Sequence, residues 1–356
     1  MSLYDASGNE IKTGAENDAY MPFMSASLRQ RVKHRDDGFD MSDFDMIRTF
    51  TPFETDYSTQ SGTPMVLNIS ADSFRQTFYE PYLGYHDGLL VTKKNLGLDE
   101  SGQYPIWCYD FIPKNAKRKI LLSSGMHTYE LPGSFGLARW IKDFMESDDA
   151  VFQYMRENVA ISLIPIINPW GFNQNPKHYG NIKGVNPNRN FDDWTGLWAT
   201  FPVYTPDQNE WNVKGSAPFS EAETRIIAKW LKDNTDAEYW IDCHTGLGCT
   251  RTDYGDVWYY YSAGNPNADS INRAADAIAE YVTTTYGRTA KKYTDPTLIN
   301  NIQQHYGDKV VGVPSMAIEQ ATGSDTLMQT VPNNSPAAIT YYALQIHAYV
   351  VSQLQG

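Results

Sequence analysis

From residue 89 onward, short runs of apolar residues alternate with polar turns in the manner of strands. The segments 89–98 and 104–113 both read as strands, and the turn residues Asp99 to Gly102 lie between them. Two strand-like segments joined by a short, turn-rich connection predict a hairpin.

Strand-like and helix-like segments alternate through the rest of the chain. The segment 158–169 is a continuous apolar run, as expected of a strand buried on both faces. Ser220 and Glu223 are spaced as in a capping box at the start of a helix. Further strands are predicted at 119–125, 237–244 and 314–320, and further helices at 134–145, 267–286 and 336–354. This order predicts an α/β fold with a mixed, mostly parallel sheet covered by helices on both faces.

The first 75 residues have a different character, because they are polar and irregular. A segment of this kind buries little apolar surface by itself. We predict an N-terminal arm or attachment segment at 1–75 and a main domain at 76–356. The arm could dock a partner or a larger assembly, and an extension wrapped on the main domain is the alternative.

Composition narrows the functional classes. Of 356 residues, 41% are hydrophobic and 20% are charged, as in a soluble globular protein. The net charge of −13 repels a phosphate backbone, so we expect no nucleic acid partner. No run approaches the roughly 18 apolar residues of a membrane span, and the N-terminus lacks a signal-peptide pattern. We therefore expect a soluble protein, either cytoplasmic or released as part of an assembly.

Several polar residues lie where predicted strands end. His127 and Glu130 follow the strand that ends near Ser124, His244 closes the strand 237–244, and Glu319 lies in the last strand. In open α/β sheets, ligands bind beyond the carboxyl ends of the strands. We therefore expect these side chains to meet at one edge of the sheet.

Two imidazoles and one carboxylate are a sufficient ligand set for a catalytic zinc ion that keeps one position open. An H-x-x-E sequence at the start of a helical turn places His127 and Glu130 on the same side. Taken singly, His244 could be a core histidine and Glu319 part of an ion pair. An unpaired Glu319 buried in an apolar strand would be costly, however, unless a partner such as metal-activated water received it.

Two further motifs follow in order along the chain. Residues 168–172 read N-P-W-G-F, and residues 184–191 read G-V-N-P-N-R-N-F. Together with H-x-x-E, the lone His244 and Glu319, these motifs resemble those of the zinc carboxypeptidase family over residues 117–323. The resemblance implies a carboxypeptidase-like fold for the main domain.

The resemblance also implies roles for individual residues. His127, Glu130 and His244 would hold one Zn²⁺ ion, Glu319 would act as general base and acid, and Asn188 and Arg189 would bind the terminal carboxylate of a substrate. A planar guanidinium suits the last task because it can bond both carboxylate oxygens. The implied activity is hydrolysis of the C-terminal amide bond of a peptide with a free carboxylate. A cell-wall peptide is one candidate substrate, because the N-terminal arm could dock a peptidase to a larger assembly.

The chain departs from the family pattern beside the metal ligands. Asn186 occupies the position of an Asp that usually supports the first zinc histidine, and an amide lacks that negative charge. Asp242 is a candidate to substitute for it. Two residues before His244, Asp242 would point to the same face of a strand and could orient a metal ligand.

Two family features on the substrate side lack a clear counterpart. No Arg lies between Pro169 and Asn188, where the family often has one that stabilises the oxyanion, and Arg251 could reach in instead. For the family's mobile Tyr, we favour Tyr293 over Tyr306. Trp170 in the first motif is a further departure without a physical explanation.

Two alternative functions remain open at this point. A zinc deacylase that cleaves N-acyl amino acids would share the metal ligands and differ in its pocket. An inactive metal-binding module in a larger assembly would account for Asn186 and for the missing Arg, although it would have little reason to keep Glu319.

Overall fold

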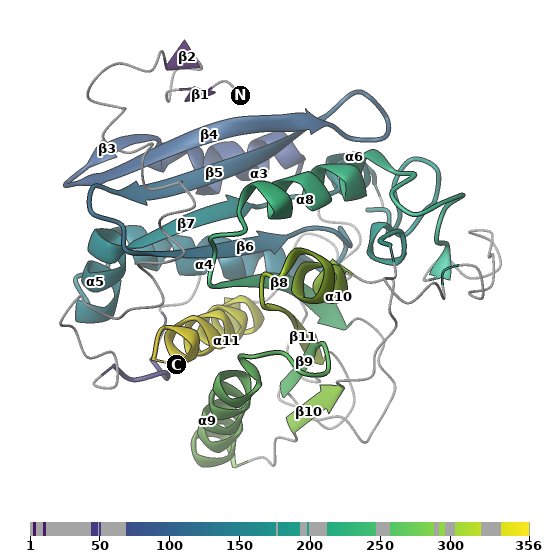
Figure 1. The fold of residues 1–356 in the computed structure, drawn as a ribbon. Helices are drawn as coiled ribbons and strands as arrows, with labels where there is room; N and C mark the ends of the chain where they lie inside the picture. Colours follow the sequence, from purple (N-terminus) through teal and green to yellow (C-terminus); the bar gives the residue numbers. More distant parts are fainter. Residues whose placement is uncertain are drawn as a thin grey trace.

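The computed structural model describes residues 3–4, 10–11, 44–48, 50, 69–175, 177–192, 198, 212–246, 257–287, 292–295, 303–321 and 336–355. Within these ranges, an 11-stranded mixed sheet has the order β10-β9-β11-β8-β6-β7-β5-β4-β1-β2, and β3 pairs with β4 outside this path (Figure 1). The strands are β1 (Leu3–Tyr4), β2 (Glu10–Ile11), β3 (Gly84–His86), β4 (Leu89–Leu98), β5 (Pro105–Pro113), β6 (Arg118–Ser124), β7 (Val159–Ile164), β8 (Tyr239–Gly246), β9 (Val257–Tyr261), β10 (Lys292–Asp295) and β11 (Ser315–Ala321).

The mixed α/β sheet expected from the sequence is confirmed, and four parallel strands lie at its centre. Strands β7, β6, β8 and β11 pair in parallel with one another in that order. The predicted hairpin is the antiparallel pair β4–β5, and β5 also pairs antiparallel with β7. Helices connect the central strands, whereas a short turn connects β4 to β5, and this difference in connection explains the difference in direction.

Helices cover both faces of the sheet. They are α3 (Ala71–Phe78), α4 (Leu131–Glu146), α5 (Ala150–Asn158), α6 (Pro169–Asn173), α8 (Ala222–Asp233), α9 (Ala268–Tyr286), α10 (Gln303–His305) and α11 (Pro336–Gln355), with 3₁₀ turns η5 (Glu80–Tyr82) and η6 (Pro187–Arg189) and a π-helical turn η9 (Tyr306–Val311). None of these helices combines the length and the apolar character needed to cross a bilayer.

Strand β8 separates two apolar clusters. Ile241 and Cys243 pack into the larger cluster with residues of α4, α9 and α11, whereas Trp240 packs into the smaller cluster with residues of α8. Helix α11 lies beside α4 and α9 (Figure 1) and is buried almost all round, which explains why its sequence is apolar on every side. Alternate residues of β8 therefore face opposite layers, and His244 shares the face of Trp240.

Two helices begin differently from the sequence prediction. Helix α4 begins at Leu131 rather than near Ser134, because a proline in its first turn fits a helix start and Glu130 becomes the N-cap. The predicted capping box at the start of α8 is wrong. The N-cap there is Glu221, and the Glu223 carboxylate instead accepts hydrogen bonds from the Asn181 side chain and from a backbone N–H in the β4–β5 loop.

Part of the N-terminal 75 residues contacts the main domain. Strand β1 pairs antiparallel with β4, and the ring of Phe50 is buried in the larger apolar cluster. Arg48 forms ion pairs with Asp143 at 3.3 Å and with Asp149 at 2.9 Å. The boundary between arm and main domain near residue 75 stays a prediction.

Candidate metal centre

The chain turns sharply between strand β6 and helix α4. Gly125 has φ of +68°, and a Cβ atom there would lie 3.0 Å from the Cα atom of Ile166, so the turn needs glycine. The backbone N–H of Glu130 then donates to the carbonyl of His127 at 3.1 Å. This compact turn brings the His127 and Glu130 side chains to the same side, at the carboxyl end of the sheet.

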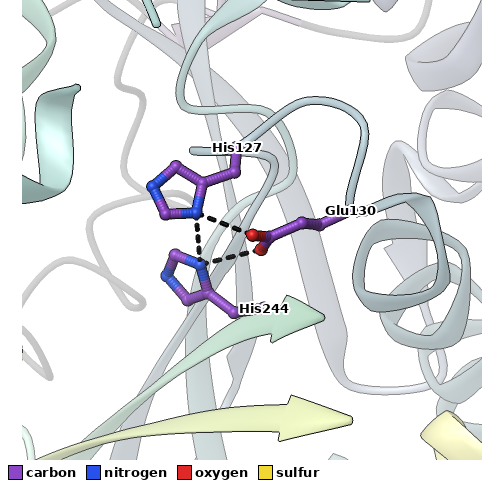
Figure 2. Close-up of side chains that lie close together, drawn as sticks. All are labelled: His127, Glu130 and His244. Carbon is purple, nitrogen blue, oxygen red and sulfur yellow. Dashed lines mark hydrogen bonds and ion pairs between the residues drawn. The ribbon is translucent and has the colours of Figure 1, made fainter. Parts of the chain in front are cut away.

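His244 reaches the same point from strand β8. Its Nδ1 atom lies 3.2 Å from Nδ1 of His127 and 3.0 Å from Oε2 of Glu130, while Nδ1 of His127 lies 2.8 Å from Oε1 of Glu130. Figure 2 shows one nitrogen of each imidazole and the Glu130 carboxylate pointing toward one another. All three side chains are buried, with at most 5% of each residue exposed. The three residues form a group with the spacing of metal ligands.

The distances fit a zinc ion. Ligand atoms about 2.1 Å from a tetrahedral zinc lie roughly 3.4 Å from one another, close to the 3.2 Å between the two Nδ1 atoms. The far nitrogen of each ring faces an oxygen acceptor, Asn186 for His127 and Asp242 for His244, so each far nitrogen carries a proton. With both rings neutral, the two Nδ1 lone pairs would face each other across the site, an arrangement that a cation between them stabilises.

The charges of the three side chains favour the same conclusion. Burial alone would raise the pKa of Glu130, but His127 and His244 hold it well below its usual range. Burial alone would lower the pKa of His244, but Asp242 and Glu130 raise it well above its usual value. Burial lowers the pKa of His127 despite Glu130. The pocket thus holds an ionised carboxylate that attracts positive charge, whether a proton or a metal ion.

Glu319 lies on the strand next to His244. The parallel register pairs Glu319 of β11 with His244 of β8, and the Glu319 side chain is partly buried on the same face of the sheet. Burial and the nearby Glu130 carboxylate raise the pKa of Glu319 to about 8, although His244 and Arg189 lower it. Positive charge at the three ligands would favour its ionised form.

Comparison with known proteins identifies the family of the chain. The family model for zinc carboxypeptidases matches residues 94–343. The chain belongs to the zinc carboxypeptidase family. No curated protein sequence that was compared with the chain gave a significant match.

Three solved structures share the fold at low sequence identity. Carboxypeptidase A from Helicoverpa armigera is 13% identical, with a TM-score of 0.57 over 98% of this chain and 82% of that chain. A metallo-carboxypeptidase from Burkholderia cenocepacia is 14% identical, with a TM-score of 0.53 over 82% of this chain and 70% of that chain. Bovine thrombin-activatable fibrinolysis inhibitor, in a complex with tick carboxypeptidase inhibitor, is 13% identical, with a TM-score of 0.55 over 79% and 93%.

The two imidazoles of the site are supported differently. His127 Nε2 lies 3.0 Å from the side-chain oxygen of Asn186, whereas His244 Nε2 contacts the carboxylate of Asp242. One carboxylate oxygen of Asp242 contacts His244, and the other accepts from Ser123 at 2.5 Å. The expectation that Asp242 replaces the missing charge behind His127 stays a prediction. Alternation along β8 places Asp242 and His244 on one face, as the sequence predicts.

Asn188 and Arg189 lie on the turn η6, which begins one residue after Asn186. The side chain of Asn186 caps this turn by accepting the backbone N–H of Asn188 at 2.8 Å. Arg189 donates from Nη1 to the carbonyl of Asn188 at 2.9 Å, and its charge lowers the pKa of Glu319. The turn therefore places a guanidinium close to Glu319.

Two predicted substrate contacts are not tested by the described residues. Arg251 lies outside the described residues, and Tyr293 lies in strand β10, where the structure describes only its backbone. Tyr306, the alternative to Tyr293, is buried between the rings of Phe191 and Phe219, at centroid distances of 5.6 and 5.1 Å. Its packing is that of a core residue.

Two contacts to the metal ligands were not predicted from the sequence. The backbone N–H of Thr245 donates to Oε2 of Glu130 at 3.0 Å, and the ring of Tyr179 stacks on the ring of His127 at 4.1 Å between centroids. The first contact depends on the end of strand β8 and the second on a loop between two motifs. Neither belongs to a motif, so no pattern in the sequence could have predicted them.

Proposed function

We propose that the protein is a zinc-dependent carboxypeptidase that hydrolyses the C-terminal amide bond of peptides with a free terminal carboxylate. The main support is the convergence of His127, Glu130 and His244 beside Glu319 at one edge of the sheet. The family membership supports a peptidase among the hydrolytic reactions that such a site can perform.

In this proposal, the three ligands hold a single Zn²⁺ ion. When bound, zinc supplies a Lewis acid that polarises the scissile carbonyl and makes a water molecule acidic. Glu130 keeps its charge because the two imidazoles hold its pKa low. The backbone N–H of Thr245 fixes one of its oxygens, so the carboxylate keeps its orientation toward the two Nδ1 atoms.

Glu319 acts as the proton carrier. A carboxylate next to the metal site accepts a proton from the attacking water and then passes it to the nitrogen of the leaving amine. Its position on β11, in register with His244, keeps it within the same group of charges as Glu130 and Arg189. A group with a pKa raised toward neutrality is suited to take up and to release a proton in one cycle.

Asn188 and Arg189 bind the terminal carboxylate of the peptide. Their turn lies beside the site, and the guanidinium can form two parallel hydrogen bonds to a carboxylate. Arg251 would stabilise the oxyanion and Tyr293 would close over the substrate; both roles are expectations from the sequence. Recognition of a free carboxylate makes the enzyme an exopeptidase.

An assay panel tests this function. The zinc-loaded full-length protein is given peptides with a free C-terminus, the same peptides with an amidated C-terminus, a cell-wall peptide and N-acyl amino acids. We expect release of the last residue from free peptides only. Turnover restricted to N-acyl amino acids would establish the deacylase instead.

Glu319→Gln isolates the chemical step. We expect this variant to bind zinc as the native protein does and to lose at least about 100-fold in kcat, because an amide cannot accept the proton. Glu157→Gln, on the exposed side of α5, is the matched control and should keep full activity. Bound zinc with no turnover of any substrate by the native protein would favour an inactive module.

A further inference from the structure

A column of aromatic rings ends on one of the two metal-ligating imidazoles. The ring of Tyr179 stacks on His127 with an interplanar angle of 22°, and Tyr129 stacks with Tyr179 at 5.2 Å between centroids and 28°. Both tyrosines are buried, with 4% of each residue exposed. The His127 ring is therefore held in its plane by packing as well as by hydrogen bonds.

Tyr179 also contacts Asn186, which lies beside the far nitrogen of the His127 ring. The side-chain nitrogen of Asn186 donates to the hydroxyl of Tyr179 at 3.1 Å. The side-chain oxygen of Asn186 accepts the backbone N–H of Asn188 at 2.8 Å and lies 3.0 Å from His127 Nε2. A backbone N–H can only donate, so the oxygen must face this way and His127 Nε2 must carry the proton. Nδ1 of His127 then presents its lone pair to the metal position.

A neutral amide holds an imidazole less firmly than a carboxylate does. A hydrogen bond to an ionised acceptor is roughly twice as strong as one between neutral groups. His244 has such an ionised partner in Asp242, whereas His127 has the amide of Asn186. The orientation of His127 must therefore depend more on what packs against its ring.

We propose that Tyr179 is a positioning residue of the metal site. Its ring holds the imidazole of His127 by stacking, and its hydroxyl holds the side chain of Asn186. Together these contacts orient His127 as a carboxylate in the place of Asn186 would. This inference rests on the metal-binding part of the proposed function and does not depend on peptide hydrolysis. Zinc affinity is accordingly the measured quantity, and activity is not needed.

A double-mutant cycle on the full-length protein tests the proposal. Zinc affinity is measured by competition with a chelator for the native protein, Tyr179→Leu, Asn186→Asp and the double variant. We expect Tyr179→Leu to weaken zinc binding roughly tenfold, as is typical for loss of a residue that orients a ligand. In the Asn186→Asp background the same change should cost less than about threefold, because the carboxylate then orients His127 by charge.

The coupling separates positioning from a general structural role. If Tyr179→Leu costs the same in both backgrounds, or costs nothing in either, the proposal is overturned. A native protein that binds no zinc overturns both this inference and the proposed function, whereas zinc binding without coupling overturns this inference alone.

Two more variants guard against a folding artefact. Tyr179→Phe keeps the ring and removes the hydroxyl, so if the leucine variant does not fold, the cycle is repeated with phenylalanine and the cost should again shrink by at least half in the Asn186→Asp background. Tyr239→Phe is the matched control. Tyr239 is a buried tyrosine on the opposite face of β8, and its hydroxyl bonds to the carbonyl of Val350 at 3.4 Å. Its replacement should leave zinc affinity unchanged.

Discussion

The two sides of the metal centre orient their imidazoles by different physical means. On the strand side, Asp242 lies two residues before His244 and contacts its far nitrogen with a full negative charge. On the loop side, His127 is held by the neutral side chain of Asn186 and by a stacked ring. A chain can thus keep the geometry of a metal ligand after losing the charge behind it, provided that packing replaces part of the orienting force.

The difference also shifts the pKa values of the two imidazoles in opposite directions. Asp242 and Glu130 raise the pKa of His244 despite its burial, whereas burial lowers the pKa of His127. We therefore expect His244 to carry a second proton when no metal is bound. Metal binding must displace that proton, and the three predictions below follow from this asymmetry.

The largest effect should come from removing the strand-side ligand. We expect His244→Ala to abolish zinc binding and hydrolysis together, because two ligands cannot hold the ion in a catalytic arrangement. Elemental analysis after dialysis, combined with the peptide assay, measures both. The control is His86→Ala on strand β3, whose imidazole bonds to the carbonyl of Tyr82 far along the chain from the ligands and should not matter for zinc. Zinc bound at one equivalent in the His244 variant would refute the ligand assignment.

Removing only the charge behind His244 should have an intermediate effect. Asp242→Asn keeps the shape of the side chain but makes both supports neutral, and we expect zinc affinity to fall by about 10-fold to 100-fold. Chelator competition at a pH where His244 is neutral gives the value. An unchanged affinity would mean that the charge of Asp242 contributes nothing beyond what Asn186 provides on the other side.

The smallest effect, taken per pH unit, should be the dependence of zinc affinity on pH. Below the raised pKa of His244, each binding event releases one proton, so apparent affinity should rise about tenfold per pH unit. His127 is neutral in the same range because burial lowers its pKa, so it should add no second proton. Calorimetry in buffers of different ionisation enthalpy counts the protons released. Glu319, with a pKa of about 8, would release a second proton when a cation binds beside it, so the count is made in the Glu319→Gln variant. A count of two near neutral pH in that variant would contradict the asymmetry, and adding Asp242→Asn should bring the count below one.

Features with short-range causes could be predicted from the sequence. The hairpin of β4 and β5 depends on turn residues between two strand-like runs, and the contact between Asp242 and His244 depends on the alternation of side chains along one strand. The turn that carries His127 and Glu130 follows a strand end, where ligand sites of such sheets are expected. In each case the cause lies within a few residues of its effect.

Features that depend on distant packing could not be predicted. Tyr179 reaches His127 only because the loop after α6 folds back over the end of β6, and nothing in its neighbours indicates that contact. The capping box failed for a similar reason, since the β4–β5 loop and Asn181 supply stronger partners for Glu223 than Ser220 does. Tertiary partners overrode a local pattern there.

The pairing of Glu319 with His244 has a consequence for how the site is assembled. Because side chains alternate along a strand, displacement of β11 by one residue against β8 would turn Glu319 into the large apolar cluster and bring Ile318 to the ligands. Such an error would bury an ionisable group among hydrocarbon side chains and would destroy the chemistry at once. Glu319 therefore also favours the correct alignment of β11 on β8, because a chain paired one residue out of register would be less stable.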